Sequence, residues 1–305
     1  MNLSTSNFSK FLIKLIFIVS VISFILTKIF EQNIILKTQT SGAYKINKII
    51  NEDLENEIPI FGTSRAKSNY SSSIINKNCF NYGVDGISSK IWIFFLEEEL
   101  KKNKQKPIII NFDLNGFRNY LGSNSNYIFN YPSIKNLTNQ HSFNNNLPLL
   151  KYYGYYEYYL TEYLKYKFPL NKIIDKGGVY SNSIFSDSDF NFNIIRRSKL
   201  SEFFKIDSNQ VKKLFSLINA TNRKIYFVIS PYHKSVLNNY SNLKDAFQFL
   251  RLLEKCENVK VLNYSEVELK NEMFFNTSHL NYNGSQLFSK LLLDSLKLID
   301  SENFN

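Results

Sequence analysis

The chain has few of the residues that build cross-linked, fibrous or metal-bound proteins. Its 305 residues include only 2 Cys, 10 Gly, 6 Pro and 3 His. Two cysteines exclude a disulfide framework, and so little glycine excludes a collagen-like repeat. We expect Cys79 and Cys256 to be buried thiols rather than one bridge. The sequence also lacks metal-ligand spacings, a P-loop and a dinucleotide-binding fingerprint, so we expect neither a metal nor a cofactor.

Basic residues are numerous but scattered. The chain has 37 Lys and Arg against 26 Asp and Glu, a formal net charge of +11, without a run of five basic residues. This pattern favours attraction to an anionic surface or polymer, and we do not expect a nucleic-acid partner. Apolar residues make up 44% of the chain, which excludes global disorder and allows a sizeable core.

A long apolar segment lies near the N-terminus. Its uninterrupted part runs from Leu15 to Thr27, and counting from Phe11 to Phe30 gives a helix of about 30 Å, which is long enough to cross a membrane. A small-residue cleavage site does not follow closely, so we favour an uncleaved anchor over a cleaved signal peptide or a buried core helix. The short N-terminal tail favours a cytoplasmic N-terminus with the main domain outside, although the positive-inside bias is slight.

The rest of the chain alternates strand and helix patterns. We divide it into a cytoplasmic tail and transmembrane anchor (1–30), a polar tether (31–57) and an α/β domain (58–305). Strands are expected at 58–61, 78–82, 107–112, 224–229 and 259–263, and helices at 88–102, 207–220, 243–255 and 287–299. This alternation predicts a doubly wound, flavodoxin-like parallel sheet of about five strands with helices on both faces.

Residues from about 117 to 200 break this alternation and are expected to form an insertion. They include an Asn-rich stretch at 124–146 and a tyrosine-rich stretch at 152–166. The tyrosine rings could form a sugar-binding wall, or they could belong to a helical insertion that packs its rings on the sheet. Both interpretations are open at the level of sequence.

Two residues at opposite ends of the domain suggest nucleophilic chemistry. Ligands of a doubly wound sheet bind at the carboxyl ends of its strands. Ser64 follows the first strand in Gly-Thr-Ser-Arg, where a tight turn would expose its hydroxyl; the alternative is a plain helix N-cap. His279 precedes the last helix and could take the proton of a serine nucleophile at neutral pH.

Four other residues follow strands at the same predicted edge. Gly83 allows close backbone approach and a free N–H, or forms a plain turn. Asn115 has an amide that could donate to an oxyanion. His233 contacts substrate or stabilises its own loop. Arg65 pairs with an anionic group of the substrate or with a nearby carboxylate.

Taken in order, five segments resemble the sequence blocks of the SGNH (GDSL-like) hydrolases: FGTSRA, NYGVDG, IINFDLNG, SPYH and NTSHLNYNGSQLF. The resemblance covers residues 58 to about 295. It is greatest to the membrane-anchored subgroup associated with surface polysaccharide and teichoic-acid modification. It implies Ser64 as the nucleophile and His279 as the base. It also implies oxyanion donors at the backbone N–H groups of Ser64 and Gly83 and at Asn115.

The sequence departs from that family at Asn276, where the family has an acid three residues before its histidine. An amide can orient an imidazole, but it cannot stabilise an imidazolium as a carboxylate does. Glu272 or Asp85 could supply the missing charge. With this departure, Ser64, His279 and Asn276 are the expected catalytic residues.

The resemblance implies an esterase or acyltransferase in a bacterial cell membrane. It would act on ester-linked acyl groups, expected to be O-acetyl, and its partner would be an acylated surface glycan or another anionic polymer of the envelope. The alternative is a non-catalytic envelope protein that keeps the fold and binds glycan or protein partners. Fold resemblance alone does not decide between them.

Overall fold

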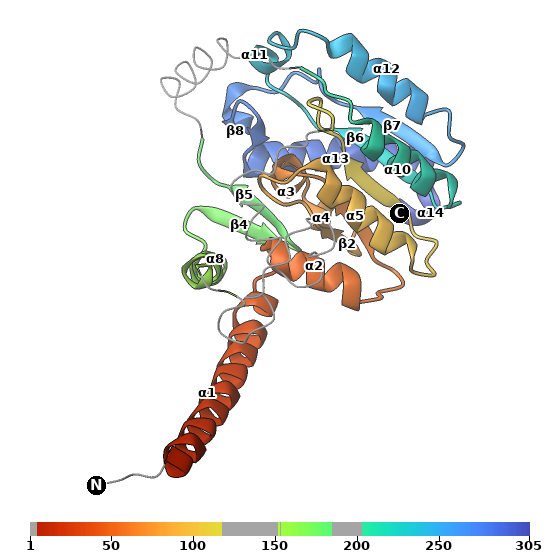
Figure 1. Cartoon of the computed structure of the whole chain (residues 1–305). Coiled ribbons are helices and arrows are strands. Elements are labelled where there is room, and N and C mark those ends of the chain that lie inside the picture. Colours follow the sequence, from red (N-terminus) through yellow and green to blue (C-terminus); the bar gives the residue numbers. More distant parts are fainter. Residues whose placement is uncertain (1–4, 118–151, 153, 185–202) are drawn as a thin grey trace.

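The computed structural model describes residues 5–117, 152, 154–184 and 203–305. A long helix, α1 (Thr5–Asn33), projects from an α/β domain (Figure 1). The domain contains a five-stranded parallel sheet of order β2-β1-β3-β6-β7. Its strands are β1 (Ile58–Phe61), β2 (Cys79–Asn81), β3 (Ile108–Asn111), β6 (Ile225–Ile229) and β7 (Val259–Asn263). The predicted flavodoxin-like sheet is confirmed.

Strand β3 is the middle of this sheet. Ile109 pairs with Ile60 of β1 on one side and with Tyr226 of β6 on the other. Ile109 and Ile110 are both fully buried but belong to different core clusters. Successive side chains of a strand point to opposite faces, so the continuous apolar run serves a sheet that is covered on both sides.

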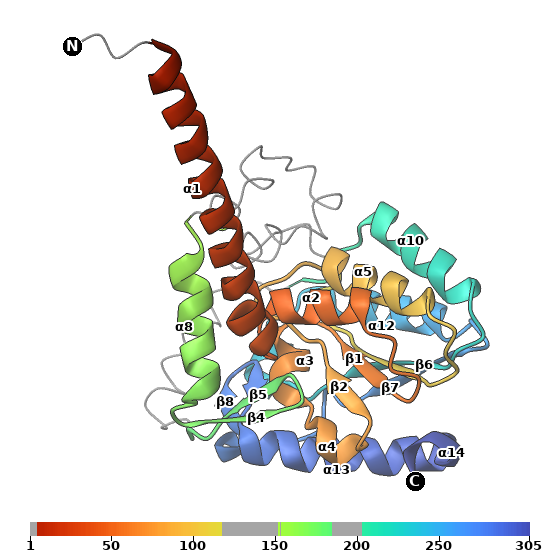
Figure 2. The same ribbon diagram turned by 90° about the horizontal axis from the view of Figure 1, so that it is seen from below.

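Helices cover the two faces of the sheet (Figure 2). One face carries α2 (Gly42–Asn51), α5 (Ser89–Leu100), α10 (Ser208–Asn219) and α12 (Leu243–Leu253). The other carries α4 (Ser72–Ile75), α13 (Tyr282–Ile299) and α14 (Ser301–Phe304). The four expected helices are present. Helix α13 begins earlier than predicted because the Asn281 side chain caps it, accepting from Gly284 N at 3.0 Å.

The predicted tether over 31–57 is instead packed structure. It contains a short 3-10 helix, η1 (Ile35–Lys37), and helix α2, capped by Ser41. Ile35, Ile46 and Ile49 are fully buried in the core. The general polarity of this segment masks apolar residues at helical spacing, which is why the sequence suggested a free linker. Helix α1 is therefore joined to the domain through a packed helix.

The described part of the insertion packs partly beside the C-terminal end of α1 and partly, through its hairpin, against α3 and α13. It forms α8 (Tyr156–Lys167) and a hairpin of β4 (Lys172–Asp175) and β5 (Gly178–Ser181). The rings of Tyr152, Tyr156 and Tyr159 contact the ring of Phe30. These three tyrosines are packed rather than forming an open sugar-binding wall, but they pack against α1 and not on the sheet as the packing interpretation expected. The Asn-rich stretch at 124–146 lies outside the described residues.

Helix α1 carries the segment predicted as an anchor. Phe8–Lys37 is long and apolar enough to cross a membrane, with a mean hydropathy of 2.3 over its most apolar window. Only 6% of that window is buried inside the protein, unlike a core helix.

Candidate active site

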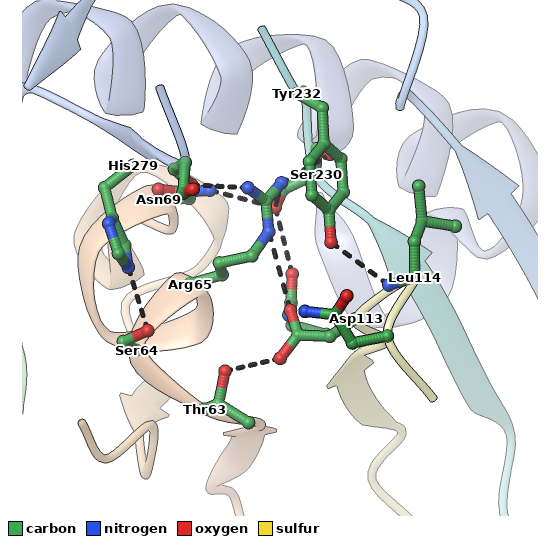
Figure 3. Close-up of polar contacts among 12 residues, drawn as sticks. Thr63, Ser64, Arg65, Asn69, Asp113, Leu114, Ser230, Tyr232 and His279 are labelled. Atoms are coloured by element: carbon green, nitrogen blue, oxygen red, sulfur yellow. Dashed lines mark hydrogen bonds and ion pairs between the residues drawn. The ribbon is translucent and has the colours of Figure 1, made fainter. Parts of the chain in front are cut away.

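Ser64 is the first residue of α3 (Ser64–Asn69), directly after the turn that ends β1. That turn requires Gly62, which has a φ of +145°, and a Cβ there would lie 2.8 Å from the Ala66 Cβ. His279 opens β9 (His279–Leu280), the partner of β8 (Phe274–Asn276) in a small hairpin. Figure 3 shows the two side chains facing each other, with Ser64 Oγ 2.8 Å from His279 Nε2. The structure thus brings together two residues that are 215 positions apart in sequence.

Asn276 lies behind the histidine. Its Oδ1 is 3.0 Å from His279 Nδ1 and accepts two backbone bonds, from the N–H groups of Ser278 and His279, both at 2.9 Å. A flipped amide would turn its NH₂ group toward these two donors, so they fix the oxygen on this side. His279 therefore donates from Nδ1 to Asn276 and accepts the Ser64 hydroxyl proton at Nε2, which is the tautomer a general base requires.

The two carboxylates considered as substitutes for an acid have other partners. Asp85 pairs with Lys67 Nζ at 2.6 Å, and Glu272 lies 3.9 Å from Lys270 Nζ. Burial acts to raise the pKa of Asp85, but the charges of Lys67 and, more weakly, His279 hold it below its ordinary value. Asn276 is thus the side chain that faces Nδ1, and Asp85 influences His279 only through space.

Gly83 does not take the predicted oxyanion role in this structure. Its N–H donates to Asn81 Oδ1 at 2.8 Å, so the donor is already used. A Cβ at Gly83 would lie 2.3 Å from Lys67 N, which means that glycine is needed here for the close approach of α3. The sequence therefore pointed correctly to a position that needs glycine, but the reason is backbone packing rather than an oxyanion donor.

Asn115 lines the cavity beside Ser64 and His279. Its Oδ1 accepts from the Tyr240 hydroxyl at 2.6 Å. This bond orients the amide, so Nδ2 is the group that Asn115 can offer as a donor.

Arg65 is buried and bonded to several protein groups, and it also lines the cavity at Ser64. Its Nη2 donates to Ser230 O, Ser230 Oγ and Pro231 O, each at 2.8 Å, and its Nη1 donates to Ser278 O. Asp113 Oδ1 lies 3.5 Å from Nε, and the Tyr232 ring centroid lies 3.4 Å from the guanidinium carbon. Of the two interpretations, pairing with a nearby carboxylate is the one observed.

His233 has a local role, so of its two interpretations the one observed is that it stabilises its own loop. It caps α11 (Lys234–Leu237), where its Nδ1 accepts from Ser235 N at 3.2 Å. Its Nε2 lies 3.2 Å from Asn271 Oδ1, and its ring packs edge-on against Phe274. Burial lowers the pKa of His233, and it does not line the cavity at Ser64.

The cavity at Ser64 measures about 240 Å³. Besides the residues above, its lining includes apolar side chains that the sequence did not single out: Ile87, Trp92, Phe112 and Val236. They come from three separate parts of the chain, and although Phe112 lies in one of the sequence blocks, nothing in its residue type marked it as a cavity residue. Thr63 was also missed; its hydroxyl donates to Asp113 Oδ2 at 2.5 Å.

Two smaller expectations concern thiols and metals. Cys79 and Cys256 are free thiols, the first buried as predicted and the second partly exposed. Within the described ranges, no three His, Cys, Asp or Glu side chains gather where they could hold a metal ion.

Comparison with known proteins gives a distant likeness of fold. No family model matches the chain, and no curated protein matches it. A solved structure described as "a putative platelet activating factor from Streptococcus pneumonia" aligns with a TM-score of 0.42 and 14% sequence identity, over 90% of this chain and 99% of that chain. At this distance the likeness says nothing about individual residues or substrate.

Proposed function

We propose that the protein is a membrane-anchored, SGNH-like serine esterase or acyltransferase that acts on ester-linked acyl groups. The observation that carries the proposal is the line of hydrogen bonds from Ser64 Oγ through His279 to Asn276 Oδ1, at 2.8 and 3.0 Å. A hydroxyl at the end of a parallel strand, bonded to an oriented imidazole, is the arrangement of an activated nucleophile. The ordered sequence blocks that resemble this family support the same assignment.

In the proposed mechanism, Ser64 Oγ attacks the acyl carbonyl carbon while its proton passes to His279 Nε2. The Ser64 backbone N–H and Asn115 Nδ2 donate to the resulting oxyanion. His279 then protonates the leaving alkoxide, and an acyl ester remains on Ser64. Water or a sugar hydroxyl attacks that ester and gives its proton to His279. His279 passes this proton to the departing Ser64 Oγ, which releases the acid or the acylated sugar and restores the free serine. Asn276 accepts from Nδ1 throughout.

The proposed substrate is an acyl group, such as O-acetyl, on a surface glycan or another anionic polymer of the envelope. A cavity of about 240 Å³ is small for a drug-sized ligand and suits a short acyl chain. The net charge of +11 favours an anionic polymer. Helix α1 would hold the enzyme in a bacterial membrane, with its N-terminus in the cytoplasm and the α/β domain outside.

A fluorophosphonate probe, which reacts with activated serines, tests this proposal on the full-length protein in detergent. We expect labelling of the wild type, none of Ser64→Ala, and weak labelling of His279→Gln. Ser89→Ala is the matched control, because Ser89 lines the same cavity but bonds to Gln210 Oε1. A folded wild type that resists labelling would contradict catalysis. It would favour the second candidate, a non-catalytic glycan- or protein-binding member of the fold, which the uncharged Asn276 also favours.

A further inference from the structure

We propose that Arg65 and Asn69 are positioning residues that hold His279 in line with Ser64. The inference rests on the function proposed above and adds to it the part of the chain that maintains the catalytic geometry. Both residues lie on α3, the helix whose first residue is Ser64, and they are one helical turn apart on the same face.

The two side chains hold the residues on either side of His279. Arg65 Nη1 donates to the carbonyl of Ser278, and Asn69 Oδ1 accepts from Leu280 N at 3.0 Å. The backbone is thus held just before and just after the base. Because the same helix carries the nucleophile, Ser64 and His279 are fixed to one rigid element rather than to two independent loops (Figure 3).

The hairpin that carries His279 needs this outside support. It consists of β8 and the two-residue strand β9, and its pairing shifts register between Phe274 and Asn276. A two-stranded hairpin is only marginally stable on its own. Bonds within the hairpin orient the imidazole through Asn276, but they do not fix its distance from α3.

Arg65 and Asn69, which together we call the clamp, are bonded to the centre of the sheet. Asn69 Nδ2 donates to Ser230 Oγ at 2.9 Å, which in turn donates to Asn111 Oδ1 at 3.0 Å. Ser230 follows β6 and Asn111 ends β3, so the network reaches the two central strands. Asn69 and Ser230 are fully buried and Arg65 is 5% exposed. Buried polar side chains that are hydrogen-bonded to one another stiffen a structure, and Asn69, Ser230 and Asn111 form such a chain.

The charge of Arg65 is compensated where it lies. Asp113 supplies a carboxylate and Tyr232 an aromatic face. Burying a guanidinium costs desolvation free energy that its partners must offset. In the proposed role, these partners let Arg65 join the loops after β3 and β6 to the backbone beside His279.

The test measures kcat and KM for a soluble acetyl ester, with the rate of fluorophosphonate labelling, in full-length variants. Asn69→Ala should lower kcat and the labelling rate by about 10- to 100-fold with little change in KM, because misplacing a catalytic group by about 1 Å costs up to about 100-fold. Asn69→Asp keeps an oxygen for Leu280 N but loses the Nδ2 donor to Ser230 Oγ, so it should recover only part of that loss. Asn258→Ala is the control: it removes amide bonds to three backbone carbonyls at the opposite edge of the sheet and should leave both rates unchanged.

Arg65→Lys provides a second, independent variant in case Asn69→Ala does not fold. Lysine keeps the positive charge beside Asp113. Its single ammonium group, however, cannot donate at the same time to the carbonyl of Ser278 and to those of Ser230 and Pro231. We expect a loss of kcat similar to that of Asn69→Ala. Folded variants of both residues with the rates of Asn258→Ala would overturn the clamp while leaving the serine mechanism intact. Absence of labelling in the wild type would instead overturn the proposed function itself.

Discussion

Asn276 is the residue that separates this site from a full Ser-His-acid triad. Its oxygen accepts three donors, two of them backbone N–H groups, so the orientation of the amide is fixed. The correct tautomer of His279 is therefore secured without a carboxylate. What the site lacks is the negative charge that would stabilise the imidazolium formed when Ser64 attacks.

Replacing Asn276 with Asp should restore this charge without changing the hydrogen bonds. A carboxylate keeps an oxygen for all three donors and stabilises the charged imidazole. We expect Asn276→Asp to raise kcat on a small acyl ester by roughly 10-fold, below the limit of about 10⁴-fold for the reverse change in a serine protease. The acid limb of the pH–rate profile should move to higher pH, because His279 would hold its proton more tightly.

Steady-state kinetics across pH check this prediction. The double variant with Ser64→Ala and Asn276→Asp gives the background rate without the nucleophile. An unchanged rate with an unchanged pH profile would mean that the charge of another group, such as Asp85, already serves His279.

The sequence identified the chemistry-bearing residues better than it identified their partners. Ser64, His279 and Asn276 were predicted because each lies in a block of recognisable order, and the structure brings them together. Gly83 was placed at the correct edge, but its N–H bonds to Asn81 rather than facing the cavity, and for Arg65 the carboxylate partner was one of two alternatives. A strand-end position in the sequence says where a residue lies. It does not say whether its donors face the cavity or neighbouring backbone.

At the scale of single elements, helix α11 is capped by a residue that can titrate, His233. Burial lowers the pKa of His233 below its ordinary 6.5, so the folded protein favours the neutral ring. Below about pH 6.5 the unfolded chain takes up a proton that the folded chain resists, and stability is lost as the pH falls. Above that pH both states are neutral and the effect disappears.

His233→Asn should reduce this pH dependence. Asparagine can still cap the helix but does not titrate in this range. We expect the thermal unfolding midpoint of the wild type to fall more than that of the variant between about pH 7 and about pH 5. An equal fall of the unfolding midpoint in the two proteins over this pH range would contradict the proposed effect of His233 on stability.

Strand β3 is the element on which the fold depends most. Ile109 is fully buried and lies between β1 and β6. Ile109→Asp should prevent folding, because an unpaired buried carboxylate costs several kcal/mol. Ile109→Val, the matched control, should cost only about 0.5–1.5 kcal/mol. Circular dichroism and expression in the soluble or detergent-extracted fraction check both, and a folded Ile109→Asp protein would contradict the central position of the strand.

The regular elements were predictable because their apolar patterns are strong, whereas α2 was not. The run at 107–112 is continuous, as a strand buried on both faces requires, and β3 appears there. In α2 the buried residues are interrupted by lysines and asparagines, and Lys45 is itself buried, with its Nζ donating to Gly83 O and Gly177 O at 2.5 and 2.8 Å. These partners come from distant parts of the chain, so the local sequence pattern of α2 does not predict them.

At the scale of the whole molecule, the α/β domain and α1 are joined by packed structure. The Tyr152 hydroxyl donates to Glu31 at 2.8 Å, and Lys45 connects α2 to the loop after β2. If α1 spans a membrane, the domain is therefore held close to its surface rather than on a loose tether.

A topology measurement tests the orientation proposed for this arrangement. Protease added to intact spheroplasts should digest residues 31–305, because we place the domain outside the cytoplasm. A cytoplasmic marker protein that survives the treatment shows that the membrane remained closed. Full protection of the domain under these conditions, with digestion after lysis, would reverse the orientation.

The central claim is that Ser64 forms a covalent acyl ester with the help of His279, and trapping that ester tests it most directly. The full-length protein is mixed with an activated acetyl ester, quenched in acid within the first turnovers, digested and mapped by mass spectrometry. The account predicts an acetyl group on Ser64 in the wild type, its absence from Ser64→Ala, and slow accumulation in His279→Gln. A folded wild type with an unmodified Ser64, or equal acetylation of Ser64 with and without His279, would contradict it.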